Sequence, residues 1–440
     1  MTEGSKNQAL AATNRHWLLL WLVFFLSPFL WPYIHGTAMA FSLLAMATGL
    51  AASAAMWQPA RRVSRGLDLL PWIWLVALLL PGFLLLLTDQ ARNPWNLWLQ
   101  SLFIASAWLV FVFSREQASC LFATRAWALL LAVVIHLYVI YAVMQWLGIR
   151  PFEDVLAASL FPFWSHAGQA KSFAGPLAQQ NLHGLFLCLV LMVLFSRVVD
   201  TVSDRWWPWW AMCLLPSMNL VATGSRWSFV VFVVGLGLLI FASRFRTQAI
   251  LRVFSCLLVA VLLYWMLLEL RAFYLEAFAD VSNRTIVEAF QQRGVSARLL
   301  IWDLCIRLFM EHPWLGIGLG NLASYGAEGQ ALVLNVHPEW ADHAIYVQHA
   351  WAHNTIFQLL VEAGLIGGAA ILVLYSAVIG RFVGLIRQRV RLTDGAFQGC
   401  LGSGLILMHG MVSASAFNVF FMVLLGLYAA STFPLHRSES

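Results

Sequence analysis

Apolar runs of about 20 residues recur along this chain and constrain its fold more than any other feature. They begin near Trp17 and continue to Pro434. A helix of that length crosses roughly 30 Å of hydrocarbon and satisfies its backbone hydrogen bonds internally. Runs such as 69–87 and 227–242 are apolar on every face, whereas a membrane β-barrel would show short segments of alternating polarity. The sequence therefore predicts an all-α polytopic membrane protein.

The composition agrees with that prediction. Hydrophobic residues make up 61% of the chain and charged residues only 10%, and the mean hydropathy is +0.78. These values lie outside the range of ordinary soluble domains, so lipid is the expected solvent. The pI near 9.2 would suit a nucleic-acid-binding protein, but basic loops on one side of a membrane give the same value.

We predict about twelve transmembrane helices, since that many runs are long enough to span a bilayer. The expected spans are 17–34, 38–57, 69–88, 97–113, 122–147, 181–199, 206–223, 226–243, 251–270, 354–380, 397–413 and 415–434.

Positive charge predicts the orientation of these helices. With a cytoplasmic N-terminus, 17 of the 26 lysines and arginines fall in inner segments, as the positive-inside rule expects. Both termini are then cytoplasmic, and the basic pI needs no nucleic-acid partner. The two long outer loops, at about 148–180 and 271–352, carry most of the remaining polar sequence.

The expected organisation therefore has five parts, and the second outer loop is large enough to be a small domain. In order, these are a cytoplasmic tail (1–16), transmembrane helices one to nine (17–270), the outer loop domain (271–352), helices ten to twelve (353–434) and a cytoplasmic tail (435–440), with the first outer loop (about 148–180) inside the second part. The loop domain contains a helical stretch, Val295 to Met310, followed by the turn-rich HPWLGIGLGN.

The sequence lacks the spacings of protein-built metal sites. It has no CxxC or HExxH, so we expect no metal and no cofactor. Five of the six cysteines lie in or beside apolar spans and only Cys305 lies in a long polar segment, which argues against a disulfide framework. GIGLGN follows no strand and lies on the outer side, so it is not a nucleotide-binding fingerprint.

Histidines gather on the outer side, and one pair suggests chemistry. Nine of the twelve map to the outer half or its loops, and His349 and His353 are four residues apart, as on one helical face, at the start of the tenth span. A neutral imidazole there could take a proton from a hydroxyl. A helix-capping or interfacial role for the pair is the alternative.

Arg226, in TGSRWSF, opens the eighth span from the outside. Its guanidinium would lie near free backbone N–H groups and the positive end of a helix dipole, which is a site for an anion such as phosphate. An arginine snorkelling to lipid headgroups is the alternative.

Other polar residues lie at neighbouring positions. Arg298 and Arg307 belong to the loop helix, which we expect to lie along the membrane surface over the site. Gln179 and Asn181 start the sixth span and could bind a sugar or a phosphate, or simply cap that helix. Three segments that enter from the outside thus carry polar groups in their first turn, which predicts a shared pocket.

Taken in order, these segments resemble the O-antigen ligase superfamily of bacterial membrane glycosyltransferases. The superfamily includes lipopolysaccharide O-antigen ligases, O-antigen polymerases and pilin-type protein O-oligosaccharyltransferases. The likeness extends from about Gly175 to Gly426 and rests on GPLAQQN, TGSR, the R–LLIW–HPWLGIGLGN helix and turn, and HN–Q–VEAGLIG.

The resemblance implies a metal-independent transfer of a glycan, en bloc, from a polyprenyl (undecaprenyl) diphosphate carrier to an acceptor hydroxyl at the periplasmic face of the inner membrane. Arg226 and Arg298 match the arginines expected to hold the diphosphate, and His353 matches the histidine expected to act as base or to position the acceptor. The expected substrate-binding residues are Gln179, Asn181, His349, Asn354, Arg307 and His409.

The acceptor is less clearly indicated. Gln179 and Gln180 before Asn181, and MHGMV around His409, look more like a protein O-oligosaccharyltransferase acting on a pilin-like protein than a ligase acting on lipid A core. The chain is short for the protein-acting group, and no acidic residue follows His409 in 413–416. A polymerase is the third possibility, and a lipid or solute transporter is the rival from another class. No internal repeat of the kind found in many transporters is evident, and the polar residues crowd one face.

Overall fold

The computed structural model describes most of the chain from Asn93 onward and short stretches before it. The described residues are 18, 21–26, 76, 79–81, 83–85, 93–114, 118–146, 180–200, 204–278, 295–336, 352–411 and 419–433. Some side chains inside the described helices are not described, and that of Arg298 is among them.

Within these residues the chain is helical and contains no strand, which confirms the predicted all-α class. The helices are α4 (Pro94–Ser114), α5 (Ala118–Ala123), α6 (Arg125–Trp146), α8 (Gln180–Asp200), η3 (Asp204–Trp206), α9 (Trp207–Ala222), α10 (Arg226–Ala242), α11 (Arg246–Phe278), α13 (Val295–Glu311), η4 (Leu322–Tyr325), α14 (Gly326–Val336), α16 (Thr355–Arg387), α17 (Gly395–Gly410) and α18 (Val419–Thr432).

Several helices have nearly the expected bounds. The helices α8, α9 and α10 begin and end within one residue of the predicted spans, and α13 matches the predicted loop helix. The run at 122–147 is divided at Thr124, whose hydroxyl donates to Leu121 O at 2.7 Å and accepts from Trp127 N–H at 3.1 Å. This side chain ends α5 and caps α6. Helix α11 continues to Phe278, beyond the expected end at 270.

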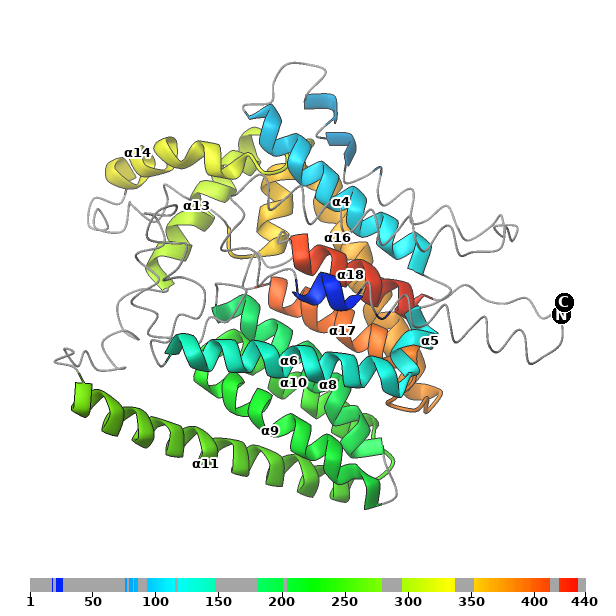
Figure 1. Cartoon of the computed structure of the whole chain (residues 1–440). Helices are drawn as coiled ribbons and strands as arrows, with labels where there is room; N and C mark the ends of the chain where they lie inside the picture. The colour runs from blue at the N-terminus through cyan, green and yellow to red at the C-terminus, as the bar shows by residue number, and fades with distance from the viewer. Residues whose placement is uncertain are drawn as a thin grey trace, which may run out of the picture.

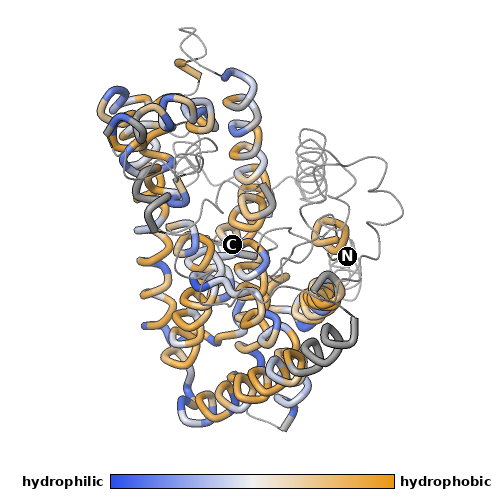
Figure 2. Tube along the Cα trace, turned by 90° about the vertical axis from the view of Figure 1, so that its left-hand side faces the viewer, coloured by the Kyte–Doolittle hydropathy of each residue, from blue (hydrophilic) through white to orange (hydrophobic). Residues whose placement is uncertain are grey.

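Four described helices are long and apolar enough to cross a bilayer: Arg125–Met144, Asn181–Asp200, Arg246–Leu268 and Thr355–Arg387. Gln100–Val112, Arg226–Ala242 and Phe421–Thr432 are shorter apolar helices. Hydrophobic residues cover most of the helical trace in Figure 2. The first three expected spans lie largely outside the described residues, so the count of twelve and the orientation stay predictions.

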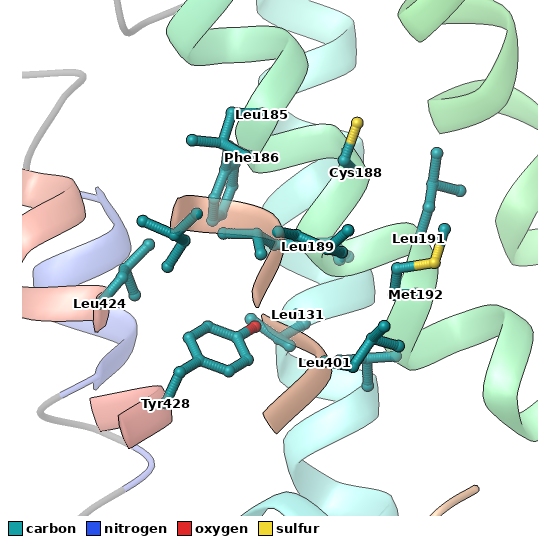
Figure 3. Close-up of a cluster of buried hydrophobic side chains, with 14 of the residues drawn as sticks. Leu131, Leu185, Phe186, Cys188, Leu189, Leu191, Met192, Leu401, Leu424 and Tyr428 are labelled. Atoms are coloured by element: carbon teal, nitrogen blue, oxygen red, sulfur yellow. The ribbon is translucent and has the colours of Figure 1, made fainter. Parts of the chain in front are cut away.

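Helix α8 is the centre of the bundle. In its spanning segment 94% of the residues are buried, although its hydropathy is that of a membrane helix. Helices α6, α9, α10 and α17 pack around it, α11 lies outside α9, and α18 and α4 follow beyond α17 (Figure 1). Its side chains form one apolar core with those of α6, α17 and α18, which Figure 3 shows at Leu131, Leu185, Phe186, Leu189, Leu401, Leu424 and Tyr428.

The two ends of this bundle differ in their polar contacts. At one end Arg197, in the last turn of α8, donates from Nη2 to the backbone oxygens of residues 122, 123 and 124 at 3.4, 2.8 and 3.1 Å. Nearby, Thr393 just before α17 donates to Asp200 Oδ2 at 3.0 Å. The start of α17 therefore lies beside the end of α8, and the two helices are antiparallel.

Helix α16 is broken at Gly364, and the turn after α13 fills the break. Gly364 has φ of 62° and ψ of −160°, so the helical hydrogen bonds stop there. Ile317 N–H donates to Val361 O and Gly318 N–H to Glu362 O, both at 2.9 Å, and Leu365 N–H donates to Pro313 O at 2.8 Å. The GIGLGN turn and the VEAG segment are thus joined through their backbones.

Glycine is required on both sides of this joint. A Cβ on Gly316 would meet the backbone of residues 361–363, and one on Gly364 would meet the backbone oxygen of Trp314. Gly316 and Gly364 also have positive φ, which a residue with a Cβ adopts only at a cost. The joint fixes the first part of α16 against α13 and separates it from the part that packs on α17.

Candidate active site

The starts of α8 and α10 meet in a hydrogen-bonded network that the end of α17 completes. Ser225 Oγ donates to Asn181 Oδ1 at 2.8 Å and lies 2.8 Å from Ser228 Oγ. Ser228 Oγ lies 3.2 Å from the backbone oxygen of Asn181 and 3.3 Å from Nε2 of His409. We call Asn181, Ser225, Ser228 and His409 the helix-start network.

Local sequence explains why this network forms. Ser225 is the N-cap of α10, and its Oγ accepts from Ser228 N–H, while Gly224 at φ of 64° turns the chain into the cap. On α8, Gly184 leaves the space that Ser228 occupies. A Cβ on Gly184 would lie 2.5 Å from Ser228 Oγ and 2.7 Å from Ser228 Cβ. The two helices therefore approach closely only because residue 184 has no side chain.

Arg226 is the first residue of α10 and its side chain is exposed. The unpaired N–H groups of a helix start and the helix dipole favour an anion at this point and disfavour a cation. An exposed guanidinium here adds to the positive potential of the helix end. The local electrostatics are therefore suited to a doubly charged ligand such as a diphosphate.

A buried polar pair, His183 of α8 and Asn219 of α9, lies one step further along α8 from the helix-start network. His183, two residues after Asn181, is fully buried, and its Nε2 lies 2.7 Å from Asn219 Oδ1 of α9. Tyr138 of α6 stacks on the imidazole with ring centroids 6.1 Å apart. The sequence analysis left His183 among the outer histidines without a role, whereas in the structure it joins three helices.

A second group of polar contacts surrounds Ala352, at the start of α16. Trp302 Nε1 of α13 donates to Ala352 O at 2.7 Å, and Ala352 N–H donates to Gln358 Oε1 at 2.7 Å. Gln358 Nε2 donates to Glu362 Oε1 at 2.7 Å, and the same oxygen accepts from Leu322 N–H at 3.2 Å. We call Trp302, Gln358 and Glu362 the Ala352 clamp.

His353 directly follows the clamped residue. It has φ of 49°, in the left-handed region that non-glycine residues rarely adopt, and its side chain is partly buried. Asn354 is the N-cap of α16, and its Oδ1 accepts from Ile356 N–H at 2.9 Å and Phe357 N–H at 3.1 Å. Asn354 therefore caps α16, while its role in substrate binding stays a prediction.

Of the remaining predicted residues, the structure describes the side-chain contacts of Arg307 but not those of Arg298, Gln179 or His349. Arg307 is exposed and its Nε donates to Asp303 Oδ2 at 3.1 Å, an ion pair within one turn of α13. Arg298 lies in α13 one turn before Trp302, and its side chain is outside the described residues, as are Gln179 and His349 entirely. Burial raises the pKa of the Cys305 thiol to about 12, so this cysteine of α13 stays protonated.

The structure thus assembles the predicted residues in two groups. Asn181, the turn that carries Arg226, and His409 come together from α8, α10 and α17, whereas His353 and Asn354 lie just before α16, where α13 packs against it. The segments far apart in sequence that form the second group lie side by side at the upper left of Figure 1. The predicted shared pocket for all three helix starts stays a prediction.

Sequence reasoning assigned no role to Ser228, Trp302, Gln358 or Glu362. Glu362 had a detectable signal, because an acidic residue within a long apolar run is costly and rarely without purpose. Gln358 lies four residues before Glu362, a spacing that suits a side-chain hydrogen bond on a helix. Trp302 gave no such signal, since its partner is a backbone oxygen 50 residues away.

A comparison with protein families finds one match. A family model described as O-Antigen ligase matches residues 211–372, from within α9 to the middle of α16. The matched segment includes Arg226, Arg298, Arg307, His353 and Asn354. No curated protein matches the chain.

Proposed function

Because a family model described as O-Antigen ligase matches residues 211–372, we propose that the chain is a membrane glycosyltransferase of that superfamily, which moves a glycan from a polyprenyl (undecaprenyl) diphosphate carrier onto an acceptor hydroxyl. The single observation that carries this proposal is Arg226, exposed at the first residue of α10 beside the helix-start network. The helix dipole and the guanidinium are both positive at that position, which supports the binding of a diphosphate there.

In the proposed reaction the acceptor oxygen forms a bond to the anomeric carbon of the glycan. The bond from that carbon to the diphosphate breaks, and the carrier diphosphate leaves with the negative charge. Arg226 and Arg298 stabilise this charge as it develops. The imidazole of His353 takes the proton of the hydroxyl, or holds the hydroxyl in line for attack.

The other polar residues have supporting roles in this proposal. Asn181 uses its amide oxygen to accept from Ser225, so its amide N–H group is the part that would donate to a sugar or phosphate oxygen. Gln179, His349, Asn354 and Arg307 are proposed to contact the donor or the acceptor. His409 contacts Ser228 and would act on the donor through the helix-start network.

We place the reaction at the periplasmic face of a bacterial inner membrane. Supporting this, the end of the bundle opposite the site carries the ends of α8, α10 and α16 with their arginines, as expected for a cytoplasmic side. The acceptor that we favour is a serine or threonine hydroxyl of a pilin-like protein, followed by lipid A core and then by the growing glycan itself.

Reconstitution tests the proposal. The purified protein in lipid vesicles, given a polyprenyl-diphosphate-linked glycan and a pilin-like protein, should attach the glycan to the protein, and parallel reactions with lipid A core and with donor alone identify the acceptor. His353→Ala and His353→Asn should both lose most transfer, about a hundredfold, and Asn tolerates the left-handed backbone of residue 353. Movement of the donor across the membrane without transfer to any acceptor would favour the transporter.

A further inference from the structure

Both backbone polar groups of Ala352 are held by side chains from two different helices. Trp302 of α13 binds its oxygen and Gln358 of α16 binds its N–H, each at 2.7 Å. Ala352 is itself fully buried. A residue whose N–H and backbone oxygen are both hydrogen-bonded has little freedom to rotate about its backbone dihedral angles. The conformation of the next residue, His353, is therefore largely set by these contacts.

Gln358 accepts the Ala352 N–H because Glu362 orients the Gln358 amide. A glutamine amide has one accepting and one donating end, and only the accepting end binds the Ala352 N–H. Glu362 Oε1 accepts from Leu322 N–H and so offers lone pairs, which turns the Gln358 NH₂ toward it. Gln358 and Glu362 are each only 1% exposed, so water does not compete for these bonds.

Glu362 is in turn fixed by the joint in α16. It lies two residues before the break at Gly364, and its backbone oxygen accepts from Gly318 N–H at 2.9 Å. The side chain and the backbone of Glu362 are therefore both attached to the segment between α13 and η4. A chain of hydrogen bonds therefore connects this joint through Glu362 and Gln358 to Ala352.

We propose that Gln358 and Glu362 are positioning residues, which hold the backbone at Ala352 so that His353 keeps its left-handed conformation and faces the acceptor hydroxyl. Trp302 completes the arrangement from α13, the helix that also carries Arg298 one turn earlier. The Ala352 clamp thus ties the helix of a donor-binding arginine to the acceptor histidine. This inference rests on the proposed function for the role of His353, but the clamp itself does not.

The geometry required for transfer explains why such a clamp would matter. A misplacement of about 1 Å between reacting groups costs up to roughly a hundredfold in rate. His353 lies directly before Asn354, the N-cap of α16, which begins at Thr355. The clamp constrains the backbone on the other side of the histidine, at Ala352.

A pair of variants at Glu362 provides the test. Glu362→Gln keeps an oxygen that accepts from both Gln358 and Leu322, whereas Glu362→Leu removes it at similar size. Amide hydrogen exchange at Ala352 should be unchanged in Glu362→Gln and about tenfold faster in Glu362→Leu. In the transfer assay, Glu362→Leu should lower kcat by about thirtyfold with the donor KM within about twofold, and Glu362→Gln should stay near the wild type.

Trp302→Phe is the milder second variant, should Glu362→Leu fail to insert. It keeps an aromatic ring against Phe357, 5.3 Å away, and removes only the donor to Ala352 O. We expect kcat to fall about fivefold at unchanged KM.

Each outcome decides a separate point. Unchanged exchange at Ala352 in both Glu362→Leu and Trp302→Phe would overturn the clamp, whether or not the protein transfers glycan. Faster exchange with wild-type kcat, where His353→Ala is inactive, would overturn the positioning role. A loss in Glu362→Gln as large as in Glu362→Leu would mean that Glu362 acts through its charge and would also overturn it.

Discussion

Arg197 and Arg226 lie at opposite ends of two packed helices and stand in opposite relation to the helix dipole. Arg197, in the last turn of α8, donates to three backbone oxygens at the end of α5 and the start of α6. Arg226 begins α10, where the backbone offers donors rather than acceptors. Arg197 therefore donates to backbone acceptors, whereas Arg226 adds its charge to the positive end of a helix dipole.

Other arginines at the Arg197 end follow the same structural pattern. Arg252 donates to Val198 O at 2.9 Å and lies over the ring of Trp206, 5.0 Å from its centroid, and Arg244 donates to Arg389 O at 3.3 Å. Arg252 and Arg244 thus bind backbone carbonyls at that end, as Arg197 does. Helix direction alone does not separate these arginines from Arg226, because Arg125 and Arg246 at the same end also begin helices, α6 and α11, where they lie over the rings of Trp209 and Phe241. Arg226 differs from them in beginning a helix beside the helix-start network.

The largest expected effect is at Arg226. Arg226→Ala should lower transfer at least about a hundredfold, because it removes a charge that stabilises the leaving diphosphate. Its thermal stability should stay equal or rise slightly, since a cation at a helix start is unfavourable by about 0.3 to 1 kcal/mol. The matched variant Arg226→Lys keeps the charge without the bidentate geometry and should fall between the two. Wild-type transfer in Arg226→Ala would break the comparison.

The next largest effect is on stability, at Arg197. Arg197→Ala leaves three carbonyl oxygens without their donor and should lower the free energy of unfolding by about 2 kcal/mol. Transfer per folded molecule should change less than about twofold. Arg205→Ala, at an exposed position in η3, serves as the control and should unfold like the wild type within about 0.5 kcal/mol. Unfolding is followed by a thermal melt in detergent.

A smaller effect is expected at Gly184, which lets α8 approach α10 at the site end. Gly184→Ala would push its new methyl group against Ser228 and should cost about 1.5 kcal/mol, with a fall in transfer as the helix-start network opens. Gly404→Ala in α17 is the control, because the nearest atom to its Cβ would be 3.9 Å away. Equal melting temperatures for the two variants would show that the close approach is unimportant.

The smallest expected effect is that of a chelator. If arginines rather than a divalent ion stabilise the leaving diphosphate, transfer in the reconstituted assay should stay within about twofold after chelation. A loss that added Mg²⁺ or Mn²⁺ restores would instead assign part of the charge stabilisation to a metal ion. That result would weaken the contrast between Arg226 and Arg197.

The sequence predicts the starts of α8 and α10 to within one residue, and these two helix starts carry part of the candidate site. Ser225 before the apolar run of α10 is a strong N-cap signal, and the observed helix begins at Arg226 as expected. The same apolar run places Arg226 at a helix N-terminus. Local patterns of this kind need information from only a few neighbouring residues, which explains their success.

The rest of the site depends on contacts between distant segments. The break of α16 at Gly364 lies within a mainly apolar run, and the pairing with residues 313–318 gives it a partner. In the structure GIGLGN is a backbone partner of VEAG, a role that neither segment's own sequence predicts. The Ala352 clamp was missed for the same reason, since hydrophobic periodicity does not report side-chain bonds to a loop backbone.

The joint at Gly364 restricts substitution at some positions of this region and leaves it open at others. It consists of backbone hydrogen bonds and glycines, so it places no demand on side chains that point away from it. The side chain of Trp314 is 68% exposed although its backbone touches Gly364. Under the proposed function, such outward positions can change with the acceptor, while Gly316 and Gly364 keep the joint that holds Glu362 and, through Gln358, the backbone before His353. Acceptor preference and catalytic geometry would then be inherited as separable traits.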